Sequence, residues 1–393
     1  MKKTIAEKLI IILISTVSGL LFFLALFMRK PYQFAAFAVV IAITLIFMRR
    51  TGFFGHMHGL IKDHRSTFFI TVAVLLMILP FALSSFPYWI GVFVLIGIFV
   101  ALAVGLNVCV GFVGLLDLGY VAFFAVGAYS TAIFTRKFPD LWYSVWLAFP
   151  VSIMLAGILG LLVGIPTLRL RGDYMAIVTL GFIQIVYLTT GNWDGLTNGP
   201  RGFDEIPAPK IGSFSLGENF NLFGIEFQAD VLLYLMVIFF VGLIVFTCHR
   251  LSHSRIGRAW VAVREDELAA EAMGVNTMRV KLSAYVLGAC IAGCCGVLFA
   301  VTQNSIIPSD FDFMKSALLL CMVVLGGMGN IAGVVIGAVL IALLDEKLQF
   351  LHQYRMAIFG LTLIVMMILR PAGLIPSKRR RLELQFGSRH QEN

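Results

Sequence analysis

Charged residues are scarce in this sequence. They make up 13% of the 393 residues, whereas 60% of the residues are hydrophobic. A soluble domain carries roughly a quarter charged residues, so this composition excludes an ordinary soluble protein. The hydrophobic residues also form uninterrupted runs, and the run 9–28 alone is long enough to cross a bilayer core of about 30 Å. The sequence therefore predicts an all-α, polytopic bundle of transmembrane helices.

The motifs of several kinds of chemistry are absent. The sequence has no H-E-x-x-H, no G-x-S-x-G and no Cys/His cluster with zinc spacing. No lysine follows a glycine, which excludes a Walker A loop, and no chain of acids and bases runs through the apolar segments. The six cysteines lie in or at the end of apolar runs, which favours packing residues over disulfides. We therefore expect no catalytic residue, no metal site and no cofactor, and energy for transport would come from another subunit.

The net charge is +9, and the Lys and Arg residues lie in short loops between apolar runs, as the positive-inside rule describes. The sequence has no stripe of alternating basic and aromatic residues, so it does not suggest nucleic acid as a partner. The segments predicted to be cytoplasmic are 49–65, 169–171, 249–281 and 378–381. The stretch 191–229 carries five acids against two bases, and we expect it outside. A signal peptide is the alternative for the run 9–28, but its length and the following Arg29 and Lys30 favour a retained helix.

The apolar runs give a count of about ten spans. They are 9–28, 33–48, 68–86, 89–108, 111–134, 145–166, 174–190, 230–248, 282–302, 316–343 and 352–369. Three runs follow the loop 249–281, although an even number must separate it from the basic tail. The run 316–343 is too long for one span and contains glycines at 326–330, so we expect it to break there.

Glycines interrupt two apolar segments, the run 111–134 and the later region 326–338. Two such segments, one in each half of the chain, are typical of a transporter built from repeats. Close packing by small residues explains the same glycines, and both interpretations stay open. The candidate pathway residues are Asn107, Gly111, Gly114, Gly119, Gly326, Gly327 and Gly329. Asp117 lies in the first segment, where it either lines an aqueous path or sits in a turn, and the turn is favoured.

The loop 249–281 contains a short amphipathic segment. Helix-forming residues are dense from Ala259 to Met273, and Gly274 is placed as a C-cap. Such a helix could lie on the membrane surface, but interfacial helices are rich in Lys and Arg, whereas this one is acidic in its middle. The mixed charge favours a groove on another protein.

Several strings resemble the LivM-type permeases of branched-chain amino acid ABC importers. Residues 271–274, Glu-Ala-Met-Gly, are similar to the Glu-Ala-Ala…Gly coupling motif of ABC permeases, within a longer match over 257–274. The other strings are 105–115, 119–129, 168–182, 198–202, 324–329 and 370–376. Together they cover about 95–376, and the first ninety residues lie outside the strongest resemblance.

The resemblance implies a permease domain over 67–376, preceded by a helical hairpin and cytoplasmic loop at 1–66 and followed by a basic cytoplasmic tail at 377–393. It implies an ATPase-coupling loop with Arg258, Arg264, Glu265, Glu267, Glu271 and Gly274. It also implies a loop facing the binding protein with Gly199, Arg201 and Gly202.

The partners that follow are a homologous LivH-like permease, two cytoplasmic ABC ATPase subunits, a periplasmic amino-acid-binding protein and membrane lipid, all at a bacterial inner membrane. The expected function is the import of branched-chain amino acids, and the substrate alternatives are other amino acids, urea or amides. A self-sufficient channel or secondary carrier is the alternative of another class, and no catalytic constellation supports a membrane enzyme.

Overall fold

A computed structural model describes residues 65–83, 86–138, 143–170, 174–212, 214–222, 225–348 and, beyond these, residues 357, 360, 361, 364, 368 and 373–375. The chain divides into two compact units, Met1–Phe86 and Pro87–Asn393. Helix α4 (Arg65–Ala82) lies in the first unit and matches the apolar run 68–86. The runs 9–28 and 33–48, and the tail 377–393, lie outside the described residues.

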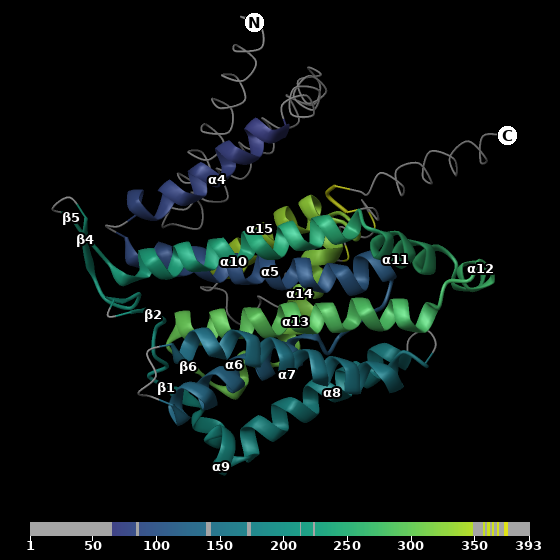
Figure 1. Cartoon of the computed structure of the whole chain (residues 1–393), viewed down its shortest axis with the longest axis horizontal. Coiled ribbons are helices and arrows are strands. Elements are labelled where there is room, and N and C mark those ends of the chain that lie inside the picture. Colours follow the sequence, from purple (N-terminus) through teal and green to yellow (C-terminus); the bar gives the residue numbers. More distant parts are fainter. Residues whose placement is uncertain are drawn as a thin grey trace, which may run out of the picture. The chain divides into compact units, whose positions relative to one another are not determined.

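The second unit is a bundle of helices (Figure 1). Its longer helices are α5 (Pro87–Asn107), α6 (Tyr120–Lys137), α7 (Ser144–Thr167), α8 (Tyr174–Asn192), α10 (Ala229–Ser252), α13 (Thr277–Gln303), α14 (Phe313–Gly326) and α15 (Ile331–Lys347). The shorter ones are the π-helix η1 (Val108–Val113), α9 (Asp194–Thr197), η2 (Gly199–Arg201), α11 (Arg255–Glu265), α12 (Glu267–Ala272) and η3 (Pro308–Phe311). The expectation of an all-α fold is confirmed.

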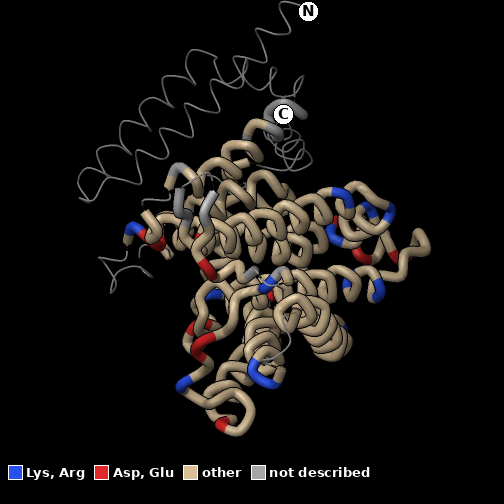
Figure 2. Tube along the Cα trace, turned by 60° about the vertical axis from the view of Figure 1, so that its left-hand side comes forward, with Lys and Arg blue, Asp and Glu red and all other residues tan. Residues whose placement is uncertain are grey.

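Five segments of the described chain are long and apolar enough to cross a membrane. They are Pro87–Val113, Ser144–Thr167, Tyr174–Asn192, Ala229–Ser252 and Thr277–Gln303. The chain is therefore a polytopic helical membrane protein. Charged residues are sparse along the tube and gather toward the two ends of the bundle, leaving the middle of the long helices almost without them (Figure 2).

Helix α13 forms the centre of the bundle, between α6 and α7 on one side and α5 on the other. Small residues allow this close packing: a Cβ atom at Gly293 would lie 2.6 Å from the Cβ of Ala156 in α7, and one at Gly164 in α7 would lie 2.9 Å from Tyr285 in α13. The pairing of early residues in α13 with late residues in α7 shows that the two helices are antiparallel.

Short strands occupy the stretch 191–229, where the sequence predicted only a loop. They are β1 (Phe203–Asp204), β2 (Lys210–Ile211), β3 (Phe214–Ser215), β4 (Phe220–Leu222) and β5 (Ile225–Phe227), and β6 (Ser305–Ile306) follows α13. Strands β2 and β3 pair with each other, as do β4 and β5, while β1 pairs antiparallel with the distant β6. We call this side of the second unit the ribbon end.

The opposite side carries α11 and α12 and is called the loop end (Figure 1). Helix α10 leads from the ribbon end to the loop end, and α13 leads back. Because α7 is antiparallel to α13, Arg169 also lies at the loop end. Residues 374 and 375, just before the basic tail, bond to the backbone of Leu325 and Gly326. Two of the four segments predicted to be cytoplasmic, at Arg169 and in the loop 249–281, therefore lie on the same side of the second unit, and residues 374 and 375 lie there too.

Both glycine-interrupted runs are broken. In the run 111–134, η1 ends at Gly114 with a left-handed φ of 80°, and α6 begins only at Tyr120. The run 316–343 consists of α14 and α15, joined by a turn at 327–330. These two arms are antiparallel, because a Cβ atom at Gly337 would lie 2.6 Å from the carbonyl oxygen of Met322. The predicted break at 326–330 is confirmed.

Candidate functional site

The two breaks meet at the loop end. Asn107, the last residue of α5, is fully buried, and its Oδ1 accepts a hydrogen bond of 2.9 Å from the backbone N–H of Gly329. These two residues are 222 positions apart in the sequence. The turn of the α14–α15 hairpin is therefore held directly on the end of α5.

Glycine is required at both sides of this contact. A Cβ atom at Gly111 would overlap Asn107 Oδ1 and would lie 2.5 Å from the backbone nitrogen of Gly329. Gly329 has a left-handed φ of 81°, and a Cβ there would lie 3.0 Å from the carbonyl oxygen of Gly111. Side chains at either position would force the two segments apart.

Arg264 of α11 reaches the same place from the loop 249–281. Its Nη1 donates a hydrogen bond to the carbonyl oxygen of Gly111. A Cβ at Gly114 would lie 3.1 Å from Arg264 Cγ, and one at Gly329 would lie 2.9 Å from Arg264 Nη1. A residue predicted for coupling thus touches three residues predicted for the pathway. We call Asn107, Gly111, Gly114, Arg264 and Gly329 the junction.

Trp260, one turn earlier in α11, fixes this helix to the bundle. Its side chain is buried, and its Nε1 donates a hydrogen bond of 3.0 Å to Ser283 Oγ in α13. Its ring stacks on Phe112 of η1, with ring centroids 6.5 Å apart. The sequence analysis did not single out Trp260, although its indole N–H, which needs a hydrogen-bond partner when buried, was a signal that could have done so.

The predicted helix from Ala259 to Met273 is two helices, and in this the sequence analysis was wrong. Asp266 has an extended backbone between α11 and α12, and its Oδ1 caps α12 by accepting the N–H of Ala269 at 3.0 Å. Aspartate is a preferred N-cap, which explains the break. The C-cap prediction is confirmed: Gly274 has a φ of 85°, and its N–H bonds to the carbonyl of Glu271.

The other predicted coupling residues face away from the junction. Arg258 and Glu265 are exposed on α11, Glu271 is exposed on α12, and Gly274 is exposed just after α12. Glu267 pairs with Lys281 at the start of α13, with 2.5 Å between the charged atoms. The loop therefore has two sides, one anchored on the bundle by Trp260 and Arg264 and one open to solvent.

The remaining pathway candidates lie at the two breaks, where they contact neighbouring backbone or form the turn. A Cβ at Gly119 would meet the backbone of Thr179 in α8, and one at Gly326 would lie 2.5 Å from the carbonyl oxygen of Gly333 in α15. Gly327 has a left-handed φ of 112° in the hairpin turn. Asp117 sits in the first turn, buried, with Oδ1 accepting the N–H of Gly119 at 2.9 Å, so the favoured turn placement is confirmed.

At the ribbon end, the predicted binding-protein loop is a tight turn. Gly199 and Gly202 have left-handed φ angles of 57° and 66°, and a Cβ at Gly202 would collide with the carbonyl oxygen of Ile306. The two glycines therefore shape the turn, and Arg201 between them is exposed.

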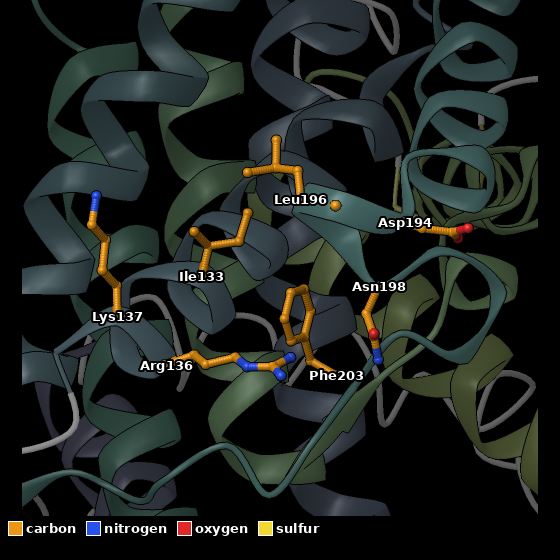
Figure 3. Close-up of a pocket in the computed structure, with 8 residues that line it drawn as sticks. Ile133, Arg136, Lys137, Asp194, Leu196, Asn198 and Phe203 are labelled. Carbon is orange, nitrogen blue, oxygen red and sulfur yellow. The ribbon is translucent and has the colours of Figure 1, made fainter.

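An open pocket of about 380 Å³ adjoins this turn. It is lined by the end of α6, by α9 and by β1, and the lining side chains are labelled in Figure 3. The guanidinium of Arg136 points toward Phe203 and lies 5.5 Å from the centre of that ring, while Lys137 extends away from it (Figure 3). The sequence analysis did not single out either basic residue.

Comparison with known proteins gives the family. The family described as "Branched-chain amino acid transport system / permease component" matches residues 88–367. The chain is 37% identical over 333 residues to the high-affinity branched-chain amino acid transport system permease protein LivM of Escherichia coli K12, with 82% of this chain and 77% of the relative covered.

Two further relatives extend this comparison. The LivM protein of Salmonella typhimurium LT2 is 39% identical over 302 residues, covering 74% of this chain and 70% of the relative. The permease protein LivH of Escherichia coli K12 is 25% identical over 285 residues, covering 70% of this chain and 90% of the relative. No solved structure matches this chain.

Proposed function

This chain belongs to the permease components of branched-chain amino acid ABC transport systems, and from that premise we propose how its residues couple transport to partner subunits. It is a multi-pass membrane subunit without a catalytic domain. The transporter we propose lies in a bacterial inner membrane, with the loop end in the cytoplasm. Its other parts would be a LivH-like permease, two ABC ATPase subunits and a periplasmic amino-acid-binding protein.

The exposed side of α12 would receive the ATPase. Leu268 and Met273 are 76% and 84% exposed, and Glu271 lies between them in the sequence. Apolar side chains this exposed, next to acids and beyond the ends of the spans, are typical of a protein interface. The acidic, mixed character of this surface supports a protein groove as its site more than a lipid headgroup layer.

The junction would pass movement of α11 to the bundle. The observation that carries this proposal is the hydrogen bond from Arg264 to the carbonyl of Gly111, beside the bond from Gly329 to Asn107. Because both glycine-broken segments end on these contacts, a shift of α11 acts on both at once. Breaks in transmembrane helices are tolerated where protein or a cavity satisfies the freed backbone, and here side chains of the protein do so.

The ribbon end would face the loaded binding protein. Arg201 is exposed there, and the pocket beside it holds Arg136 and Lys137 at its rim. Basic side chains around an open pocket support recognition of an acidic protein surface.

The coupling proposal is tested by the double variant Glu271→Ala, Gly274→Val. It removes one acid and places a β-branched residue at a left-handed φ, which strains the end of α12 by about 1 kcal/mol or more. We expect ATP-dependent uptake of labelled leucine into vesicles to be abolished, and less ATPase to co-purify, while the permease still inserts.

The matched control is the pair Glu218→Ala, Gly212→Val at the ribbon end. Glu218 is also an exposed acid, and Gly212 also has a left-handed φ, 64°, with open space around it. This control should keep its ATPase subunits. Unchanged uptake in the α12 variant would overturn the coupling assignment, and ATP-independent uptake by the purified chain alone would support a channel or carrier instead.

A further inference from the structure

Helix α8 is the least covered of the five candidate spans. Only 28% of its most apolar window is buried inside the second unit, against 83% for α13. Among the described residues it packs mainly on α6, η2 and η3 and makes fewer contacts with α7, α9 and α14. Whether lipid or protein covers the outer side of α8 can be inferred from the polarity of its exposed side chains.

The exposed side chains in the middle of the other two poorly covered spans are apolar. On α7 the exposed side chains include Met154, Ile158 and Leu162, and on α10 they include Phe239 and Leu243. Such surfaces are what acyl chains solvate, so we expect lipid to cover the middle of α7 and α10.

The outer side of α8 differs because it carries Gln184. This residue is ten positions after the start of α8 and eight before its end, and its side chain is exposed. No residue in the described part of the chain forms a hydrogen bond with its amide. A glutamine in the middle of a span is too short to bring its amide to either interface, and hydrocarbon offers it no hydrogen bond. Lipid is therefore a poor occupant of this surface.

Small residues lie on the same face as Gln184. At 100° per residue, positions 177, 181, 184, 188 and 191 share one narrow stripe of α8. The Cβ positions of Gly181 and Gly191 have no atom within 4 Å, and Ile177 and Leu188 are exposed on the same stripe. A polar side chain with glycines a turn or two away is how transmembrane helices approach one another closely and form a hydrogen bond.

We propose that this face of α8, defined by Ile177, Gly181, Gln184, Leu188 and Gly191, binds a helix of the homologous second permease subunit, with the Gln184 amide hydrogen-bonded across the interface. The proposal rests on the two-permease transporter proposed above. A related permease, LivH, carries the name of the same transport system as LivM, which makes a homologous subunit the natural occupant.

The test is a pair of spin labels in the assembled transporter, in nanodiscs and in a background without the six native cysteines. One label is placed at Gln184→Cys and the matched one at Met154→Cys, which is also ten positions from the start of its helix and exposed. We expect the label at 154 to be mobile and to collide freely with lipid-dissolved oxygen. The label at 184 should be immobilised, with its collision rate at least severalfold lower.

Equal oxygen collision rates at 184 and 154 would overturn the proposal. Dipolar broadening between two labels at 184 would overturn the choice of occupant, because it would show a second copy of this chain on the face. If the label at 184 prevents assembly, Leu188→Cys on the same face and Leu162→Cys on α7 serve as the second pair. The spin-label readout needs no ATP, so a negative result for the α8 interface is distinguishable from a failure of ATP coupling. If the purified transporter contained no second permease, that result would contradict the proposed function instead.

Discussion

The two breaks in the bundle end on the same arginine but are closed by different means. In the first turn, side chains hold the backbone: Asp117 accepts the N–H of Gly119, and Thr179 Oγ1 accepts the N–H of Leu118 at 3.1 Å. In the second, Asn107 Oδ1 also accepts a backbone N–H, but the two arms themselves meet without side chains, because Gly326 lies directly against the backbone of Gly333. A lost hydrogen bond can be partly replaced by one to water. A methyl group added between two touching backbones can be accommodated only if the backbones move apart. The two turns should therefore respond unequally to substitution.

The largest effect is expected from Gly326→Ala. The new Cβ would lie 2.5 Å from the carbonyl oxygen of Gly333 and 2.7 Å from the Cα of Val334, so only separation of α14 from α15 relieves the overlap. We expect a loss of about 3 kcal/mol in stability, at the upper end for overpacked sites. Thermal unfolding of the purified transporter measures it.

Gly242→Ala in α10 is the control, since its Cβ would meet no atom within 4 Å. It should be neutral or slightly stabilising, because alanine favours a helix over glycine by up to about 1 kcal/mol. Equal melting temperatures for the two variants would contradict the close-packed hairpin.

Arg264→Ala should have the next largest effect, and on coupling more than on folding. It removes a charged hydrogen bond, typically about 1.5–3 kcal/mol, from the contact between α11 and η1. We expect leucine uptake per ATP hydrolysed to fall about tenfold or more. The variant Arg264→Lys, which keeps one charged donor, should recover part of the loss.

Arg255→Ala is the control for this measurement, because Arg255 is an exposed residue in the first turn of the same helix. Its ratio of uptake to hydrolysis should match that of the unmodified protein. If Arg264→Ala keeps the same ratio, α11 is not joined to transport through the junction.

The smallest effect is expected in the first turn. Asp117→Asn keeps an oxygen that can accept the N–H of Gly119, whereas Asp117→Ala loses it. The alanine variant should be less stable than the asparagine variant by about 1 kcal/mol. Chemical denaturation of the two variants side by side gives this difference, and identical stability would show that the Asp117 side chain does not hold the turn.

Much of the bundle could be predicted from the sequence because it depends on hydrophobicity along a single segment. The runs 145–166 and 174–190 agree closely with α7 and α8, and the break at 326–330 followed from counting crossings. The break at Asp266 was missed because its neighbours Glu265 and Glu267 are also acidic, so the hydrophobic pattern does not change there. The three-residue spacing from Asp266 to Ala269 is that of an N-cap.

The junction could not be predicted as a site, although the sequence analysis had named all of its residues. Asn107 and Arg264 were assigned to different roles, pathway and coupling, because nothing local links them. Their meeting depends on how α5, α11 and the α14–α15 turn pack in three dimensions. The strands were missed for a similar reason: β1 is only two residues long and pairs with β6 about a hundred positions away.

The β1–β6 pair also limits how the bundle can move. It joins the connection before α10 to the connection after α13, and a further bond of 3.1 Å from the N–H of Ile206 to the carbonyl of Asn304 reinforces it. Segments fastened together at one end can rotate about that fastening but cannot separate there. The ribbon end would thus serve as a pivot, and any widening between α8, α10 and α13 would grow with distance from it and be greatest near the junction.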